Sequence, residues 1–241
     1  GVRGEHATPG EFRQSQNWIG SPGATLNEAT FVLPPVTEMQ ECLSQLEKFL
    51  HAETRLPPLV EAALVHYQFE AIHPFLDGNG RIGRLLVTLF LCQRNVLSKP
   101  LLYLSAFFEQ HRREYYELLL KVSSTGAWRE WIEFFLRAVT EQSGDAVLRS
   151  RHLQELLRSY TQLAREKHLP PTAVQLVKLI LMKPVLSTKT AQEFLKVTYP
   201  GARKAIKALL EAGILTEITG RKRDKAYAAN EVLKALGEKI D

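Results

Sequence analysis

The twelve residues from His73 to Arg84 bring together side chains and backbone features that suit phosphate chemistry. Their sequence is His-Pro-Phe-Leu-Asp-Gly-Asn-Gly-Arg-Ile-Gly-Arg. The stretch Gly78-Asn79-Gly80 can adopt positive φ angles and turn successive backbone N–H groups toward one point. It leads directly into the N-terminus of an expected helix, where further N–H groups are free and the helix dipole is positive. The stretch therefore predicts a phosphate-binding nest.

Four ionisable side chains surround this nest. Arg81 and Arg84 are three residues apart in the first turn of the expected helix, so they lie near one face. Cations at a helix N-terminus oppose the dipole, and a bound polyphosphate would remove that penalty. Asp77 is placed to hold Mg²⁺ beside phosphates. His73 has an ordinary pKa near neutrality and is the candidate general base for an attacking hydroxyl. Together these groups predict a nucleotidyl or phosphoryl transfer site.

The residues of this stretch are compatible with two other interpretations. The spacing Gly78-x-Gly80-x-x-Gly83 matches the dinucleotide fingerprint, but the preceding segment has helical periodicity rather than the required strand, and no Walker lysine follows. Taken singly, His73 would be read as a structural histidine and Asp77 as a turn cap. The density of matching groups favours a functional site over both interpretations.

Several aromatic residues elsewhere are assigned more simply. We expect His66, seven residues before His73, to be structural. Trp128 and Trp131 are expected to pack in the core, whereas Tyr115 and Tyr116 are equally compatible with the core and with a nucleotide contact. We expect a solvated helix face at residues 111–113.

The composition is that of an ordinary globular protein of 241 residues, with 45% hydrophobic and 24% charged residues. No apolar run approaches the ~18 residues needed to cross a membrane. Cys42 and Cys92 lie in apolar stretches, without disulfide or zinc spacing, as expected for a reducing, cytoplasmic compartment. The net charge of +5 is uneven, because residues 170–241 carry a net +6 and residues 1–169 a net −1.

The periodicity predicts a mainly α-helical catalytic part. Residues 1–35 form an ordered loop with one short hairpin, near Asn17–Gly20 and Ala29–Leu33. Thr37 is the expected N-cap of the first helix, which runs to about His51. The second expected helix is Pro58–His73. The third runs from Gly80 to about Arg94, is apolar almost all round and is expected to be buried. Further helices are expected at Ser105–Ser123, Ala127–Gln142 and Asp145–Lys167.

The last part of the chain has a different pattern. Pro170-Pro171 marks the expected boundary, giving domains at 1–168 and 169–241, the first divided into the loop and hairpin (1–35) and the helical core (36–168). Two short helices separated by Leu186-Ser187 and a third near Gly201–Ala212 are followed by strands at Ile214–Thr219 and Lys225–Ala228. This order predicts a small winged helix-turn-helix domain with a basic turn at residues 220–224.

The His73–Arg84 stretch resembles the motif of the Fic (Fic/Doc) family, His-Pro-Phe-x-Asp/Asn-Gly-Asn-Gly-Arg-x-x-Arg, and matches it at every specified position. The resemblance extends over about residues 1–165. Pro9–Arg13 and Gln16–Gly20 are similar to the loop before the family's flap, and Tyr103–Val122 and Trp128–Leu136 are similar to the helices after the motif. The tail resembles the winged-helix domain of one bacterial branch of the family.

The resemblance implies a helical bundle with a hairpin flap and the transfer of AMP from Mg-ATP to a Tyr, Ser or Thr hydroxyl of a target protein. His73 would be the base, with Asn79 and Arg84 also catalytic, and Asp77 would hold Mg²⁺. The hairpin at Ala29–Leu33 would dock the target backbone as an added strand. Nucleotide contacts are implied at Gly78, Asn79, Gly80, Arg81, Ile82, Gly83, Arg84 and Tyr116.

Many family members carry an inhibitory helix with the pattern Ser/Thr-x-x-x-Glu-Gly/Asn. Thr37–Cys42 and Ser105–Gln110 come closest here, and both differ at the last position. We therefore expect such a helix to lie upstream of Gly1 and this piece to be more active than the full-length protein.

Two further classes of function are left open by the sequence. The same fold also supports transfer of UMP, phosphate or phosphocholine, and the removal of AMP. Alternatively, the chain is a nucleotide-sensing regulator that binds DNA through its basic tail, especially the Arg221–Arg223 turn. The tail is equally compatible with docking a protein. The expected partners are a target protein and DNA or protein at the tail, without a membrane, and the sequence leaves a homodimer open.

Overall fold

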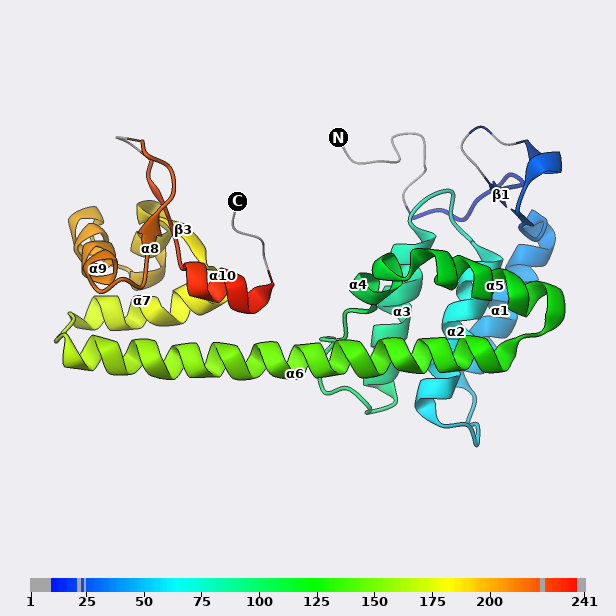
Figure 1. Cartoon of the computed structure of the whole chain (residues 1–241). Coiled ribbons are helices and arrows are strands. Elements are labelled where there is room, and N and C mark those ends of the chain that lie inside the picture. The colour runs from blue at the N-terminus through cyan, green and yellow to red at the C-terminus, as the bar shows by residue number, and fades with distance from the viewer. Residues whose placement is uncertain (1–9, 21–22, 24, 222–223, 238–241) are drawn as a thin grey trace. The chain divides into compact units, whose positions relative to one another are not determined.

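The computed structural model describes residues 10–20, 23, 25–221 and 224–237, and this part of the chain is mainly helical (Figure 1). Its α-helices are α1 (Val36–His51), α2 (Pro58–Ile72), α3 (Asn79–Gln93), α4 (Leu104–Gln110), α5 (Arg112–Thr125), α6 (Trp128–Glu166), α7 (Pro171–Met182), α8 (Thr188–Leu195), α9 (Tyr199–Glu211) and α10 (Asn230–Leu236). The shorter elements are β1 (Trp18–Ile19), the 3₁₀ turn η1 (Leu26–Glu28), β2 (Phe31–Val32), β3 (Val185–Ser187), β4 (Thr216–Glu217) and β5 (Ala226–Ala228).

The chain forms two compact units, Gly1–Gly144 (unit 1) and Asp145–Asp241 (unit 2). The boundary between them falls within α6. It therefore lies earlier than the boundary expected at Pro170-Pro171. None of the helices in the described ranges has the length and apolarity needed to cross a membrane.

The predicted hairpin of unit 1 is confirmed. Strands β1 and β2 pair antiparallel, with Trp18 opposite Val32 and Ile19 opposite Phe31. The turn between them contains η1, which a capping box of Thr25 and Glu28 stabilises. The part of the family-like loop that precedes Gly10 lies outside the described residues.

Helices α1 and α2 begin after prolines rather than at polar caps. The N-cap of α1 is Pro35 and the helix starts at Val36, so the prediction of Thr37 as its N-cap is wrong. The expected apolar face of α1 is buried through Met39 and Leu46. Pro58 is the first residue of α2, a position at which the missing N–H of proline has no cost.

The core of unit 1 is a cluster of rings between α2, α4, α5 and α6. Trp131 is completely buried, and its indole N–H donates to the carbonyl of Ala63 at 2.9 Å. His66 stacks on Phe108 and Trp131 at ring-centroid distances of 5.3 and 6.0 Å. Burial lowers the pKa of His66 to about 3, so it is a neutral member of the core, as predicted. Trp128, by contrast, is half-exposed and packs edge-on against Tyr67.

Helix α3 differs from its prediction as a helix buried all round. Val87, Phe90 and Leu91 face the core, but Leu85 and Leu89 are 55% and 51% exposed. The helix packs closely against α2 on one side (Figure 1), and no described element covers Leu85 and Leu89. Its apolar composition alone could not reveal which face has a neighbour.

Two of the predicted helix boundaries are also different. The segment expected as one helix over Ser105–Ser123 is broken at His111, where the backbone leaves the helical region with φ −106° and ψ 31°. Conversely, the helices expected at Ala127–Gln142 and Asp145–Lys167 are continuous in α6. Gly144 lowers helix propensity by only about 1 kcal/mol relative to alanine, which neighbouring packing can offset.

Unit 2 contains the predicted helices and strands in the predicted order, with one additional strand, β3, and one additional helix, α10. Strand β3 precedes α8 and pairs with β5, which also pairs with β4, so the antiparallel sheet has the order β3-β5-β4. Ser187 and Thr198 cap α8 and α9 by accepting backbone N–H bonds from Thr190 and Gly201. The tip of the basic turn, residues 222–223, lies outside the described residues.

The second half of α6 belongs to the core of unit 2. Tyr160 is buried among residues of α7 and α9, and its hydroxyl donates to a carboxylate oxygen of Glu231 in α10 at 2.9 Å. Leu153, Leu156 and Leu163 pack against the same cluster. This packing explains why the compact unit starts at Asp145, although the sequence has its strongest break at the two prolines.

We predict that Tyr160→Ala loosens unit 2 by removing a buried ring, a change that typically costs about 3–5 kcal/mol. Hydrogen exchange of the α7 and α9 amides should become faster. Leu157→Ala, on the more exposed side of α6, is the matched control and should leave these rates nearly unchanged. Equal rates in the Tyr160 variant and in the wild type would show that α6 does not anchor this core.

Candidate active site

His73 lies at the C-cap of α2, where the chain turns out of the helix. Its backbone is left-handed, with φ 49° and ψ 62°, a conformation that is uncommon for residues other than glycine. Its backbone N–H donates to the carbonyl of Phe69 at 3.0 Å, which completes the helix end. Pro74 follows, so α2 cannot continue. The turn places the imidazole in front of the loop that leads to α3.

The orientation of the His73 ring is set by the backbone. Its Nδ1 lies 3.2 Å from the carbonyl oxygen of Glu70, an atom that can only accept a hydrogen bond. Nδ1 is therefore the protonated nitrogen, and Nε2 carries the lone pair. Burial is the main cause that lowers the pKa of His73 below its usual value, so the ring is neutral at pH 7. This is the state required of a general base.

Arg13 fixes the backbone around His73. Its side chain is 1% exposed, and its Nε donates to the carbonyl of His73 at 3.0 Å. The two terminal nitrogens donate to the carbonyls of Ser15 at 3.1 Å and Pro34 at 2.5 Å. The Arg13 backbone N–H donates to the carbonyl of Pro74. One guanidinium thus joins the entry to β1, the exit from β2 and the turn at His73.

The loop after His73 is held from inside by Asn79. The Asn79 side chain is buried, accepts from the Phe75 N–H at 2.9 Å and donates to the Phe75 carbonyl at 2.7 Å. Both ends of the amide are therefore used in shaping the loop. The structure gives Asn79 this positioning role, and a direct catalytic role of its side chain stays a prediction.

The first turn of α3 differs from the predicted nest, because only Gly78 has a positive φ, whereas Asn79 and Gly80 already belong to the helix. Gly78 is the N-cap with φ 88°, a left-handed conformation that suits glycine. The N–H of Ile82 donates to the Gly78 carbonyl at 3.0 Å, the first bond of the helix. The N–H groups of Asn79, Gly80 and Arg81 have no acceptor within the helix and suit phosphate oxygens, whereas the Gly78 N–H donates to Asp77.

Gly80 and Gly83 have different surroundings. A Cβ on Gly80 would lie 3.0 Å from a terminal nitrogen of Arg84, so glycine leaves room for that guanidinium. A Cβ on Gly83 would lie 2.7 Å from a carboxylate oxygen of Glu70 and 3.1 Å from the Phe69 ring. Gly83 is buried against α2, so the structure gives it a role in helix packing beside its predicted nucleotide contact.

The two arginines of the motif are held differently. Arg81 is exposed and lies 3.4 Å from Asp77, whose other carboxylate oxygen accepts from the Gly78 N–H at 2.6 Å. Arg84 is partly buried, and its Nε donates to the hydroxyl of Ser105 at 2.7 Å. This bond leaves the terminal nitrogens of Arg84 beside the nest. Arg81 keeps the freedom of an exposed side chain.

Glu70 is a buried carboxyl beneath the nest that the sequence did not single out. One carboxylate oxygen is buried without a hydrogen-bond partner in the described residues. Burial raises its pKa to about 7, and the nearby positive charge of Arg84 lowers it. It therefore changes charge near neutrality, close to Arg84 and to the buried Tyr115, and its backbone carbonyl orients His73.

A cavity of about 560 Å³ opens beside Arg84. Tyr116 and Arg112 of α5 form one wall, with the guanidinium 5.7 Å from the centre of the Tyr116 ring. Tyr116 is 49% exposed, whereas Tyr115 is buried with its hydroxyl 3.0 Å from Nε2 of His66. Of the pair that the sequence left open, Tyr116 exposes its ring to the cavity, whereas Tyr115 is a core residue that reaches the cavity wall. The other lining residues are Arg84, Tyr103, Ser105, Ala106, Phe108, Glu109, Gln110 and Tyr115.

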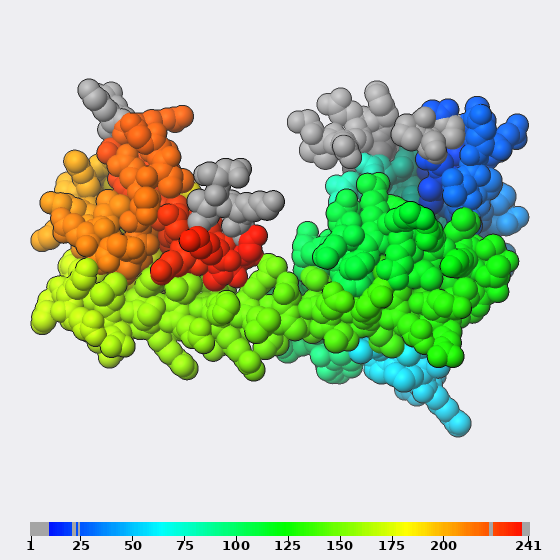
Figure 2. Space-filling model, in the orientation of Figure 1, coloured from blue at the N-terminus to red at the C-terminus, as the bar shows by residue number. Residues whose placement is uncertain are grey.

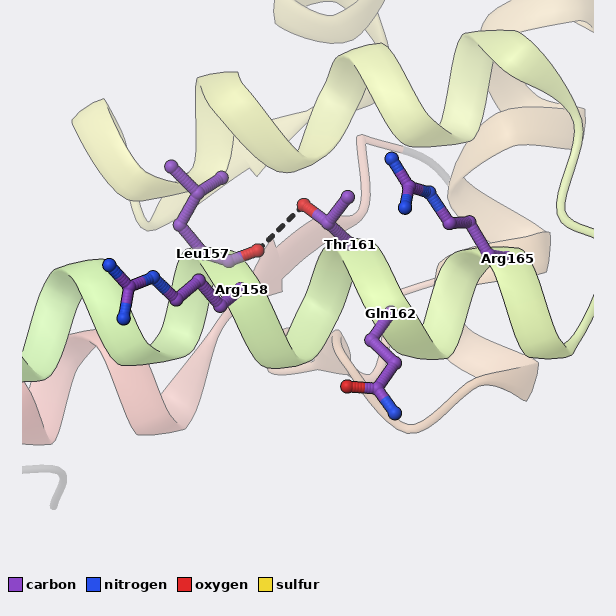
Figure 3. A pocket seen from close by; sticks show the side chains of 5 residues that line it. All are labelled: Leu157, Arg158, Thr161, Gln162 and Arg165. Carbon is purple, nitrogen blue, oxygen red and sulfur yellow. Dashed lines mark hydrogen bonds between the residues drawn. The ribbon is translucent and has the colours of Figure 1, made fainter.

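A second hollow, of about 400 Å³, lies in unit 2 and is lined by residues of α6 alone (Figure 3). The Thr161 hydroxyl in it is engaged with the carbonyl of Leu157 at 2.6 Å, as Figure 3 shows. Its lining has two arginines, Arg158 and Arg165, but no carboxylate or histidine. It lacks an acid–base group, so we assign the candidate active site to the His73 region.

The site resembles one that takes its metal together with a substrate. No group of three or more His, Cys, Asp and Glu side chains within the described ranges is arranged to hold an ion. Asp77 offers an exposed carboxylate at the edge of the nest. Mg²⁺ commonly binds through one or two carboxylates and obtains further ligands from phosphates and water. The donor set fits such an ion, and Asp77 as its ligand stays a prediction.

The structure brings together His73, Asp77, Arg81 and Arg84 with the nest, and it adds residues that the motif does not contain. Arg13 and Glu70 had no recognisable pattern beyond their place near family-like segments. Arg112 lies on the expected exposed helix face and also lines the cavity. In the sequence, Ser105 stands out only as part of a near match to the inhibitory motif. Arg13, Glu70 and Ser105 each have a partner far away in the sequence, whereas Arg112 contacts Tyr116 one helical turn away.

Comparisons with known proteins agree with this geometry. Residues 2–91 match the model of the Fic/DOC family. A protein adenylyltransferase Fic from Culex quinquefasciatus is 32% identical over 141 residues, which cover 58% of this chain and 25% of that protein. The protein of the same name from Drosophila melanogaster is 30% identical over the same coverage. The chain thus spans about a quarter of the length of the curated relatives it matches.

A solved structure shows the same fold. A Fic family protein from Desulfovibrio desulfuricans G20 aligns with a TM-score of 0.52 and 24% sequence identity. The alignment covers 94% of this chain and 64% of that protein.

We predict that Arg13→Ala lowers the free energy of unfolding of unit 1 by about 2–4 kcal/mol, because several buried carbonyls lose a charged donor. All three tryptophans lie in unit 1, so the urea midpoint measured by tryptophan fluorescence reports on this unit. Arg13→Lys should recover only part of the loss, since an ammonium lacks the planar fork. Arg55→Ala, at an exposed arginine, is the control. A midpoint for Arg13→Ala equal to that of the control would contradict the assignment.

Proposed function

Because residues 2–91 carry a Fic/DOC family domain, we propose that this chain transfers AMP from ATP to a Tyr, Ser or Thr hydroxyl of a target protein. The observation that carries the proposal is a neutral histidine, His73, whose Nε2 holds the lone pair and which lies in the turn that leads to a glycine-capped helix N-terminus. The names of the relatives support the nucleotide class.

In the proposed reaction, the target hydroxyl oxygen attacks the α-phosphorus of ATP. A new P–O bond forms to the target, and the bond between the α-phosphorus and the bridging oxygen to the β-phosphate breaks. The hydroxyl proton passes to Nε2 of His73, and pyrophosphate leaves. The bond from Nδ1 to the Glu70 carbonyl keeps the ring oriented and stabilises the imidazolium that forms.

Charge on the phosphates is stabilised by groups already in place. The backbone N–H groups at the start of α3 and the positive end of its dipole face the phosphates. Arg84, held by Ser105, supplies a fixed cation, and Arg81 supplies a mobile one once its exposed pair with Asp77 opens. Such preorganised groups stabilise developing charge without reorganisation. Asp77 would hold Mg²⁺, which neutralises phosphate charge when bound.

The cavity between α3, α4 and α5 is the proposed nucleoside site. Its volume of about 560 Å³ lies in the range of small-molecule pockets. The exposed ring of Tyr116 offers a stacking surface for the base, and Arg84 connects the cavity to the nest. The β1–β2 hairpin is the proposed target dock, where an extended segment adds a strand at the edge of β2.

The test is the incorporation of α-phosphate label from ATP into protein, with Mg²⁺ present and a candidate target mixture added. We expect label with the wild type and its loss with His73→Ala. His51→Ala, which removes an exposed histidine, should retain the label. Absence of label with the wild type, while ATP is still bound, would reject AMP transfer in favour of another donor group.

The pH dependence provides a second prediction. Because burial lowers the pKa of His73, the base stays unprotonated below its ordinary value of about 6.5. The acid limb of kcat/KM should therefore lie below pH ~6.5, the position of an unperturbed histidine.

Glu70 also titrates near neutral pH, with a pKa of about 7. Its contribution to the pH profile must therefore be distinguished from that of His73. Glu70→Gln keeps the side-chain shape and removes that titration, so the acid limb should persist at low pH in this variant. A limb that disappears in Glu70→Gln would assign it to Glu70 instead.

A further inference from the structure

Helices α8 and α9 of unit 2 form a helix-turn-helix pair. They are joined by Lys196, Val197 and Thr198, of which Lys196 has a left-handed backbone with φ 53°. Thr198 then caps α9 by accepting from the Gly201 N–H. Both helices also pack on α7. A turn of three or four residues between two crossed helices is the arrangement that presents the second helix for binding.

The two faces of α9 have opposite character. Ala202, Ala205, Ile206 and Leu209 are buried in the core of unit 2. The outward face begins with Tyr199, which is 53% exposed, and continues with cations at the spacing of one helix side. These cations are Arg203, Lys204 and Lys207, all exposed. In Figure 2 the orange segment that includes α9 forms part of the surface of unit 2.

These cations are poorly neutralised by the protein itself. Lys207 lies 3.5 Å from Glu211, whereas Arg203 and Lys204 form no ion pair with any described residue. Arg203 and Lys204 are the fifth and sixth residues of α9, beyond its first turn, so the helix dipole has little effect on them. Their charge is therefore open to solvent and to an external anion. A polyanion on this face would gain charge neutralisation that the protein itself does not supply.

Further positive charge lies near α9 in unit 2. Lys189 of α8 and Lys196 of the turn are exposed near the same helices. Residues 145–241 contain 18 Lys and Arg against 10 Asp and Glu, a net charge of +8, while residues 1–144 carry a net −3. The positive potential therefore belongs to unit 2 and not to the unit that contains the candidate active site.

We propose that unit 2 binds duplex DNA, with the N-terminal part of α9 in the major groove. The major groove admits an α-helix, and the first turns of a second helix are the part that reaches base edges in helix-turn-helix proteins. Arg203, Lys204 and Lys207 of α9, with Lys189 and Lys196 beside it, are the exposed cations available to phosphates along the groove. Duplex RNA is a poor fit, because its major groove is too narrow for this helix. The proposal does not depend on AMP transfer.

The test measures fluorescence anisotropy of a labelled duplex of about two helical turns, with the whole chain, from about 50 to about 200 mM salt. Wild-type binding should weaken steeply as salt rises. The triple variant Arg203→Ala, Lys204→Ala, Lys207→Ala should bind at least about tenfold more weakly, and the slope of log K against log salt should fall by about 2–3, since each phosphate contact contributes about 0.9.

The matched control removes the same charge elsewhere in unit 2, with Arg151→Ala, Arg158→Ala, Arg165→Ala on the exposed side of α6. It should retain most of the affinity and the salt slope. Equal losses in the two triple variants would overturn the proposal, as would no binding by the wild type. Equal binding of acidic polypeptide and duplex would also overturn it, in favour of protein docking. The single change Lys204→Glu should weaken binding too and keeps the test decisive if the triple variant does not fold.

Discussion

The left-handed turn at His73 is the constraint on which the candidate site depends. The turn ends α2, directs the chain into the Gly78 loop and places the imidazole in front of the α3 N-terminus. Such a backbone is unfavourable for histidine unless its surroundings hold it. Arg13 provides that support from one side, and Asn79 fixes the following loop from the other. Because Arg13 also binds the ends of the hairpin, the proposed target dock and the base are parts of one hydrogen-bonded unit.

Close packing of α2 and α3 determines the electrostatics of the site. Gly83 lets α3 approach α2 so closely that the Glu70 carboxyl is sealed beneath the nest. A buried carboxyl with a pKa of about 7 is about half protonated at neutral pH, so it offsets the positive charge of Arg84 only in part. The His66–Tyr115 pair fills the remaining space with neutral groups. The field at the nest therefore comes mainly from backbone N–H groups and arginines.

The two units divide the work by charge. Unit 1 has a small negative net charge, and its proposed phosphate site is a local, preorganised arrangement of N–H groups and two arginines. Unit 2 has a net +8 and presents cations along an exposed helix face, which suits a long polyanion. A nucleotide is bound by a few polar groups fixed within a pocket, whereas a DNA duplex is bound by cations spread over a surface. The two proposed activities therefore require different physical solutions in one chain.

The sequence alone determined where the motif and nearly every helix lie, because these depend on local spacing, glycines and prolines. The roles of the motif residues as base and as phosphate ligands stay predictions. It could not determine which face of α3 is covered, whether α6 continues through Gly144, or where the units divide, because those outcomes depend on packing partners. The same holds for Arg13, Glu70 and Ser105, whose partners lie 60, 13 and 21 residues away in the chain, at His73, Gly83 and Arg84. Their roles arise only when folding brings such distant groups together, and no local pattern records that contact.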